Sequence, residues 1–502
     1  MTRGAMQDDP AQARRARTWQ LLGLVFVTLP FLPAEFVPCA DMPQHLSQLR
    51  LLAEAFSWLP RTVDASQLEP RLLAPNTLVY WPLLPLYLVF SAPLAGRLGL
   101  LLLLSCCVLS LNQLARRRGR VGAGTLLAVM LLFSHPTYWG FLNFLVGVPI
   151  FFWVLAEHLG SSQPLRPRRE GLLFALGLVL LAWAHVMWTC AAAGIVVLDA
   201  LVRRDLKRAA LYLAGALPGL GAVLAWSHSV ATERQQASFD VALHYGTPLL
   251  NRLSAAWLSR GLFGGISLRF ELVAGACVLS YLCFGVYQAY QSRGKDMDAS
   301  LLRAGALLCL VGVFGPAIYL NSIDLSQRFL PYGAMLLLIG VPRPPERLVE
   351  AAFASFALSF VVFTGVTWVR FNREDLSGLG PSLAALSQPK SVLGLNYRAR
   401  AMHVAGSPFL QLFAYFQAEH GGEHNFSFAE HGSGVVVYKT ARRRSWANNL
   451  EWHAERASAH DVAQFDCTLV NATSDLHAMF RKNTGLTPLV DEGFFRLYCR
   501  AK

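Results

Sequence analysis

The chain has 502 residues, of which 54% are hydrophobic and 15% are charged, and its mean hydropathy is +0.39. This composition excludes an ordinary soluble globular protein and indicates an α-helical polytopic membrane protein. The formal net charge is +13, but lysines and arginines occur in short clusters between apolar segments. Such clusters are typical of loops held at the cytoplasmic face, so we expect no nucleic acid partner.

The first apolar segment, residues 19–36, follows a basic tail at residues 1–17. No small-residue cleavage pattern follows this segment, and the tail carries Arg3, Arg14, Arg15 and Arg17. We therefore interpret residues 1–17 as a cytoplasmic tail and residues 19–36 as an uncleaved first span that runs outward. The membrane bundle is predicted to cover residues 18–370.

The outer loop at residues 37–76 begins with a polar helix predicted from about residue 42 to 56. Asp41 and His45 are four residues apart, and Gln48 lies one turn further along. The apolar side chains fall on another side, toward lipid or protein: Leu46, Leu49, Ala53 and Phe56. One interpretation is that Asp41 caps this helix, with Pro43 in the first turn and Gln44 as capping partner. The other is that Asp41 is a functional carboxylate.

Two segments follow that differ in length. Residues 78–91 are apolar but short and contain two prolines, so we predict an interfacial or re-entrant piece. Residues 96–114 form the second span and end in the basic cluster 116–120. If both segments crossed the membrane, this cluster would lie outside, against the positive-inside pattern.

Residues 121–159 and 171–202 are each predicted to form a helical hairpin with a histidine near its outer tip, His135 and His185. The second hairpin has about 15 residues per arm, fewer than the ~20 of a full crossing, so its tip should lie below the outer surface. His185 could then serve a site in a water-filled cavity. The alternative is a histidine bonded to a backbone carbonyl within a packed bundle.

Further spans are predicted at residues 209–227, 270–290, 301–319, 329–341 and 348–368, which gives about eleven in total. Every strong basic cluster then lies on the side of the N-terminus. The outer loops contain Arg260 and Arg269, and Arg328 lies at the outer start of the tenth span. Arg328 could bind phosphate; the alternative is an interfacial arginine that snorkels or pairs with Asp324.

Residues 371–502 are polar and are predicted to form a small extracytoplasmic α/β domain. The pattern predicts strands at residues 391–395, 434–439, 465–470 and 494–499, and helices at 408–419 and 474–482. Cys467 and Cys499 could pair if this domain is extracytoplasmic. Two glycines separate His420 from Glu423 and His424, so we predict no metal site there. Asn425 and Asn471 fit the N-glycosylation pattern.

The chain resembles the GT-C superfamily of membrane glycosyltransferases. Asp41-Met42-Pro43-Gln44-His45 is similar to the D-x-P-x-H form of the family's first-loop motif, and residues 140–147 are similar to a segment of bacterial members of unknown specificity. Where many members carry two adjacent acids, this chain has Ala40-Asp41. The resemblance implies a bacterial inner-membrane protein that transfers a sugar from a polyprenyl-phosphate carrier to a glycan, lipid or protein acceptor outside.

Glycosyl transfer needs a carboxylate to accept the proton of the acceptor hydroxyl, and Asp41 is the candidate, with His45 orienting it or the acceptor. The polyprenyl phosphate leaving group needs cations, for which Arg328 is the first candidate, with His185 and Arg260 assisting and Gln48 as a further binding residue. We expect no tightly held cofactor and leave a divalent cation as an open alternative. The rival function is a non-catalytic transporter or assembly partner that binds a lipid-linked saccharide; a histidine-dependent membrane acyltransferase is a more distant third.

Overall fold

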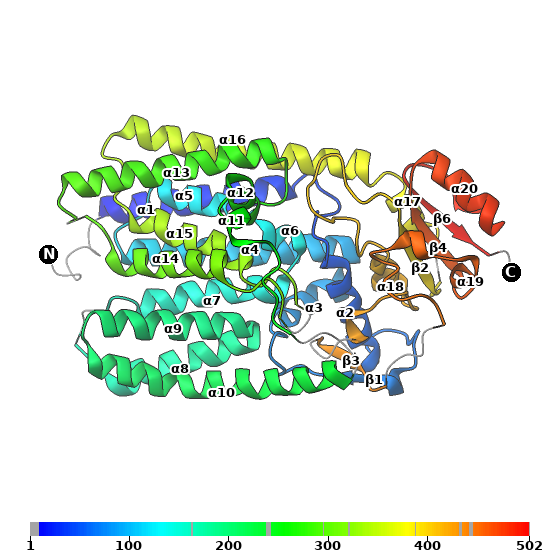
Figure 1. Cartoon of the computed structure of the whole chain (residues 1–502), viewed down its shortest axis with the longest axis horizontal. Helices are drawn as coiled ribbons and strands as arrows, with labels where there is room; N and C mark the ends of the chain where they lie inside the picture. The colour runs from blue at the N-terminus through cyan, green and yellow to red at the C-terminus, as the bar shows by residue number, and fades with distance from the viewer. Residues whose placement is uncertain are drawn as a thin grey trace. The chain divides into compact units, whose positions relative to one another are not determined.

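A computed structural model describes residues 10–161, 164–236, 242–294, 296–319, 322–386, 388–430, 434–440 and 445–500 (Figure 1). Arg3 of the basic tail lies outside these residues. The chain divides into two compact units, each described here by itself. Unit 1 comprises the described parts of Met1–Leu32, Leu101–Thr137 and Asn143–Gly365; unit 2 comprises those of Pro33–Leu100, Tyr138–Leu142 and Val366–Lys502.

Unit 1 is mainly helical. Its helices are α1 (Pro10–Thr28), α5 (Ala123–Met130), α6 (His135–Trp139), α7 (Leu142–His158), α8 (Pro167–Ala184), α9 (Val186–Val202), α10 (Leu206–Gln236), α11 (Leu249–Arg252), α12 (Ala255–Leu262), α13 (Leu268–Gln291), α14 (Ala299–Phe314) and α15 (Leu330–Gly340). The helices α4 (Ala92–Arg117) and α16 (Arg347–Arg370) contribute residues to both units. Segments α6 and α7 each extend slightly beyond the boundary of unit 1.

Four helices in the described part of the chain are long and apolar enough to cross a membrane: Ala92–Arg117, Leu206–Glu233, Leu268–Gln291 and Arg347–Asp375. Each matches a predicted span, and α14 and α15, which lie side by side, match two shorter ones (Figure 1). The total of about eleven spans stays a prediction. The helix of the first predicted span has other bounds than the apolar segment 19–36: its described part, α1, runs from Pro10 to Thr28. Alanines and arginines before residue 19 extend the helix, and Pro30 and Pro33 lie beyond its end.

The second hairpin is confirmed. A single non-helical residue, His185, separates α8 from α9, and Figure 1 shows α8, α9 and α10 side by side. The two ends of the hairpin meet, because Arg208 Nε at the start of α10 lies 3.2 Å from Glu170 Oε2 in the first turn of α8. The arms have 18 and 17 residues, slightly more than predicted.

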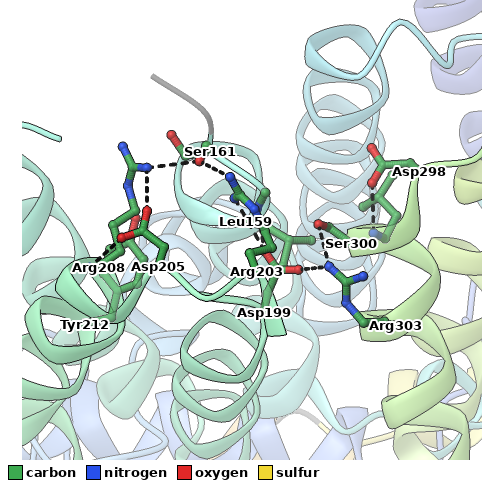
Figure 2. A network of polar contacts seen from close by, with 12 residues as sticks. Leu159, Ser161, Asp199, Arg203, Asp205, Arg208, Tyr212, Asp298, Ser300 and Arg303 are labelled. Carbon is green, nitrogen blue, oxygen red and sulfur yellow. Dashed lines mark hydrogen bonds and ion pairs between the residues drawn. The ribbon is translucent and has the colours of Figure 1, made fainter. Parts of the chain in front are cut away.

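The tight turn after α7 gathers basic residues at one end of unit 1 (Figure 2). Arg203 and Arg208 donate to the Ser161 carbonyl at 2.6 and 3.1 Å, and Arg118 donates to the Leu159 carbonyl. The buried Asp199 accepts from the Gly160 amide at 2.9 Å and also from the Arg303 guanidinium. The basic clusters 116–120 and 203–208 therefore lie at the same end of unit 1, as the positive-inside pattern predicts.

Unit 2 contains α2 (Met42–Ala55), α3 (Tyr80–Val89), α17 (Leu379–Ala384), α18 (Ala414–His420), α19 (Ala459–Val462) and α20 (Ser474–Thr484). Its larger sheet has the order β2 (Val392–Asn396), β4 (Cys467–Asn471), β6 (Phe495–Cys499), β5 (Pro488–Val490). The pair β2–β4 is parallel, and the other pairs are antiparallel. Leu393, Leu395, Val470, Phe480 and Tyr498 belong to the core that this sheet shares with α20.

Most of the strands and helices predicted after residue 371 are present. The strand predicted at residues 434–439 does not join the larger sheet: β3 (Val436–Tyr438) pairs antiparallel with β1 (Leu68–Pro70) of the loop after α2. Strand β5 was not predicted, and α18 is shorter than the predicted helix. Cys467 and Cys499 are opposite each other in the β4–β6 register and form a disulfide, with Cα atoms 4.1 Å apart.

The two asparagines that fit the N-glycosylation pattern, Asn425 and Asn471, are both buried. Asn425 Oδ1 accepts from the Gly394 amide at 2.9 Å, and Asn471 donates to Asn396 at 2.8 Å. Neither side chain is therefore placed for a glycan, and the two sequence matches are chance.

Candidate functional site

The polar helix after the first span is buried on all sides. Every residue of α2 from Met42 to Glu54 is buried, so protein covers its polar side as well as its apolar side. Two of its polar side chains have their partners in the C-terminal part of unit 2. Gln44 donates to Gln411 at 3.0 Å and to the Phe426 carbonyl at 2.9 Å, and Ser47 bonds to Gln417. The helix is thus fixed by hydrogen bonds to residues far away in sequence.

A buried ion pair continues this polar contact at the end of α2. Arg50 Nε lies 2.6 Å from Glu54 Oε1, and the Glu54 carboxylate also accepts from the amide and hydroxyl of Thr62 at 2.8 and 2.7 Å. The Thr62 hydroxyl in turn accepts from the Gly422 amide at 2.8 Å. The chain of bonds joins α2, the following loop and the residue after the C-cap of α18.

Asp41 differs from its neighbours on α2. It occupies the N-cap position, but its side chain makes no capping hydrogen bond, and Gln44 bonds elsewhere, so the capping-box interpretation is wrong. Asp64, in the same loop, shows the normal pattern, because its carboxylate accepts from the Ser66 amide at 3.0 Å. From residue 41 to 54, Asp41 alone is not buried.

The backbone before α2 is clamped by residues 138–142. The Ala40 and Asp41 amides donate to the Tyr138 and Trp139 carbonyls at 3.0 and 2.9 Å. Gly140 has φ +77°, and a Cβ atom there would lie 3.1 Å from the Asp41 nitrogen. Only glycine fits this approach without strain, so the short segment fixes where the Asp41 backbone lies.

His45 is buried and fully engaged. Its Nδ1 lies 2.8 Å from the Tyr80 hydroxyl, and its ring also bonds to the Gly140 backbone. Burial lowers the pKa of His45 to about 4, although the bond to Gly140 acts in the opposite direction. The neutral ring therefore connects α2, α3 and the 138–142 clamp, which is a positioning arrangement. Gln48 is also buried, and its Oε1 accepts from the Val436 amide at 3.1 Å, which attaches it to β3.

In unit 1, two of the predicted phosphate-binding residues meet at one aromatic ring. The His185 ring packs edge-on against Phe144 with centroids 5.3 Å apart, and the Arg328 guanidinium carbon lies 6.0 Å from the same centroid. His185 also caps α9, because Nδ1 accepts from the Met187 amide at 3.3 Å. Arg328 is buried and donates to the Ile323 carbonyl at 2.6 Å. This places a guanidinium and an imidazole around a common apolar surface.

A second group of charges lies next to Arg328. Asp324, within the 323–328 turn, pairs with His135 Nε2 at 3.3 Å. Burial raises the pKa of Asp324, but the bond to His135 and the nearby charges outweigh it and lower the pKa overall. The exposed Arg260 of α12 and His135 both act electrostatically on the buried Glu271. Arg260, His135 and Arg328 thus belong to one charged region of unit 1.

The predicted site residues fall into two sets. Asp41, His45 and Gln48 belong to unit 2, whereas His185, Arg328 and Arg260 belong to unit 1. Their convergence on one cavity stays a prediction.

Sequence reasoning missed three features of the Asp41 surroundings. These are the Tyr80 partner of His45, the Gly140 clamp and the C-terminal residues that hold α2. For the clamp, the glycine after two aromatic residues at positions 138–140 was an available signal of a turn.

No cluster of three or more His, Cys, Asp or Glu residues that could hold a metal occurs within the described ranges. The two histidines around the glycine pair are used separately: His420 Nε2 bonds to the Leu383 carbonyl at 3.0 Å, and His424 lies 3.3 Å from Ser47.

No protein-family model matches the chain, and no curated protein matches it. Two crystal structures of ArnT from Cupriavidus metallidurans are similar to it at 12% sequence identity. The apo structure has a TM-score of 0.46 and covers 97% of this chain and 98% of that chain. The structure bound to undecaprenyl phosphate has a TM-score of 0.43 and covers 96% and 97%. At this level of similarity, function has to be argued from the chain's own residues.

Proposed function

We propose that the chain is a membrane glycosyltransferase of the GT-C type, which transfers a sugar from a polyprenyl-phosphate donor to an acceptor on the outer face of the membrane. The observation that carries this proposal is the state of Asp41. Its helix is locked on all sides, its backbone is clamped by residues 138–142, and its carboxylate does not cap the helix. A carboxylate on a backbone that is fixed in this way is suited to accept a proton from a bound substrate.

Asp41 is the proposed general base. As the acceptor oxygen bonds to the anomeric carbon, the carboxylate takes the hydroxyl proton, and the carbon–oxygen bond to the phosphate breaks with its electron pair on the leaving phosphate. His45 is a positioning residue in this proposal, since both sides of its ring are engaged in holding Asp41's surroundings. Gln48 likewise supports β3.

Arg328 and His185 are the proposed phosphate-binding residues. A guanidinium binds phosphate oxygens in a fork, and its attraction to the developing charge is strongest where water is excluded, as around the buried Phe144 ring. The exposed Arg260 would add long-range attraction for the anionic carrier.

The proposed orientation places the N-terminus in the cytoplasm and residues 371–502 outside. The Cys467–Cys499 disulfide supports this orientation, because disulfides persist in the oxidising environment outside the cytoplasm. The gathering of basic residues around the turn after α7 supports it independently.

The test is transfer by the purified full chain in lipid nanodiscs, with a panel of radiolabelled polyprenyl-phosphate sugars and membrane extract as acceptor. Asp41→Asn should abolish transfer while leaving retention of the labelled donor unchanged. Asp64→Asn is the matched control, because Asp64 lies in the same loop and only caps a turn. Retained transfer in Asp41→Asn would show that Asp41 is not the base, and transport of the labelled lipid without transfer by the wild type would favour the binding or export protein instead.

A further inference from the structure

Three aromatic side chains form a cluster in unit 2. The rings of Trp139 and Phe141 are stacked, with centroids 5.8 Å apart and planes 5° from parallel. The Trp452 ring lies 6.4 Å from that of Trp139, inclined at 38°. Trp452 is 48% exposed and Trp139 is half-buried, so the cluster presents aromatic surface to a ligand.

The position of this cluster is set by the same contacts that hold Asp41. Trp139 provides the carbonyl that binds the Asp41 amide at 2.9 Å, and Gly140 lies between the two stacked residues. The neighbouring Tyr138 hydroxyl accepts from Trp368 Nε1 at 3.3 Å, which anchors the segment. The aromatic surface is therefore tied directly to the backbone of the proposed base.

Trp452 is held by a tight turn of its own. Its amide donates to the Asn449 carbonyl at 3.1 Å, and Asn449 has φ +61°. Asparagine tolerates this left-handed conformation better than most residues. The exposed indole is thus presented by a defined turn.

The combination of aromatic faces and a carboxylate selects the class of ligand. A sugar ring has an apolar face of C–H groups, which packs on an aromatic ring, and a rim of hydroxyls, which donate to a carboxylate. A prenyl or acyl chain would pack on the rings but has no group for Asp41. A nucleobase would also stack on the rings, but a nucleic acid site would need basic side chains for its phosphates.

We propose that Trp139 and Trp452 form a stacking surface for a sugar ring of the substrate, beside Asp41. This inference rests on the proposed function and extends it to a substrate-binding subsite. The sugar can belong to a free acceptor glycan or to the lipid-linked donor, which offer the same ring chemistry. Phe141 stacks on Trp139 and thereby supports it.

The test is saturation-transfer NMR on the full chain in nanodiscs, with the methyl pyranosides of glucose, mannose, galactose and arabinose as probes. We expect saturation of the ring C–H protons of at least one probe. Trp452→Ala should weaken its binding about tenfold, and Trp452→Phe should restore most of it, because a flat aromatic face remains. Trp58→Ala is the control, since Trp58 is a 52% exposed tryptophan of the same unit that stacks on Phe56.

The two sources of the sugar are separated by a second arm. If Trp452→Ala weakens binding of the polyprenyl-phosphate sugar but not of the methyl glycoside, the surface holds the sugar ring of the donor. If it weakens binding of the methyl glycoside but not of the polyprenyl-phosphate sugar, the surface holds the acceptor. Either result supports the stacking surface. Equal binding of both probes by wild type and Trp452→Ala would overturn it.

A membrane-anchoring role gives a different result. The difference in fluorescence between wild type and Trp452→Phe gives the signal of Trp452. Quenching of this signal by brominated lipid, and not by iodide in the water, would place the indole in the membrane and overturn the inference. Failure of the proposed function is distinguishable, because Asp41→Asn should lose transfer but keep glycoside binding. If Asp41→Asn retains transfer while Trp452→Ala loses binding, the assigned base is wrong and the stacking surface stands.

Discussion

The buried ion pair on α2 provides a direct measure of how firmly the Asp41 helix is held. Arg50 is 7% exposed and Glu54 is fully buried, and they pair at 2.6 Å. Glu54→Met would leave the guanidinium buried without a carboxylate and remove the acceptor of two Thr62 donors. Breaking one side of a buried pair costs about 3–5 kcal/mol, so we expect a loss of unfolding free energy of that size.

The double variant Arg50→Met/Glu54→Met tests the reasoning. With both charges replaced by apolar chains of similar length, no buried charge remains, and we expect it to be about 2–3 kcal/mol more stable than the sum of the two single variants implies. Urea unfolding of the detergent-solubilised chain, followed by tryptophan fluorescence, gives these values. The partly exposed pair Arg71–Glu69, 3.1 Å apart, is the control, and Glu69→Met should cost less than about 1 kcal/mol. Strict additivity of the two α2 substitutions would refute the argument.

Three further predictions concern unit 2. Burial lowers the pKa of His45 to about 4, below its usual ~6.5, so the unfolded chain binds more protons than the folded chain between these pH values. The unfolding free energy should therefore fall by about 3 kcal/mol as the pH drops through this window. In a pH series of urea titrations, His45→Gln should make the unfolding free energy less dependent on pH. Removing the disulfide by Cys467→Ala/Cys499→Ala should cost about 3–4 kcal/mol for a sequence separation of 32 residues, and dithiothreitol should lower the wild-type melting temperature but leave the variant unchanged. Gly140→Ala should lower transfer about 100-fold with a stability loss of only about 1–2 kcal/mol, because its Cβ would displace the Asp41 backbone; unchanged kcat would contradict this.

The helices of unit 1 could be predicted from sequence because their signals are local. Apolar length and the basic clusters identified α4 and α13 to within four residues at both ends, and α10 to within three residues at its start. The bounds of α1 were wrong because hydropathy follows apolar residues, whereas a helix follows backbone hydrogen bonding. The prolines after Thr28 are a better guide to the end of that helix than its hydrophobicity.

The surroundings of Asp41 could not be predicted, because they depend on distant residues. The pattern of α2 showed a polar side, but nothing local indicated that Gln411, Gln417 and Val436 would cover it. Strand β3 was identified by its composition, yet its partner β1 lies more than 360 residues earlier. A strand pattern indicates that a segment pairs with another strand, but it does not identify that strand.

The burial of so many polar groups on α2 has a physical consequence for Asp41. An apolar helix surface can slide or rotate over a core with little loss of contact area, whereas hydrogen bonds are directional and fail after small displacements. Gln44, Ser47, Gln48 and Glu54 each have a defined partner, so the register of the helix is specified at several successive positions. A general base must be held within a fraction of an ångström of the reacting proton. A helix fixed by polar contacts meets this requirement better than one held by packing alone, and Asp41 stands directly before the first residue of that helix.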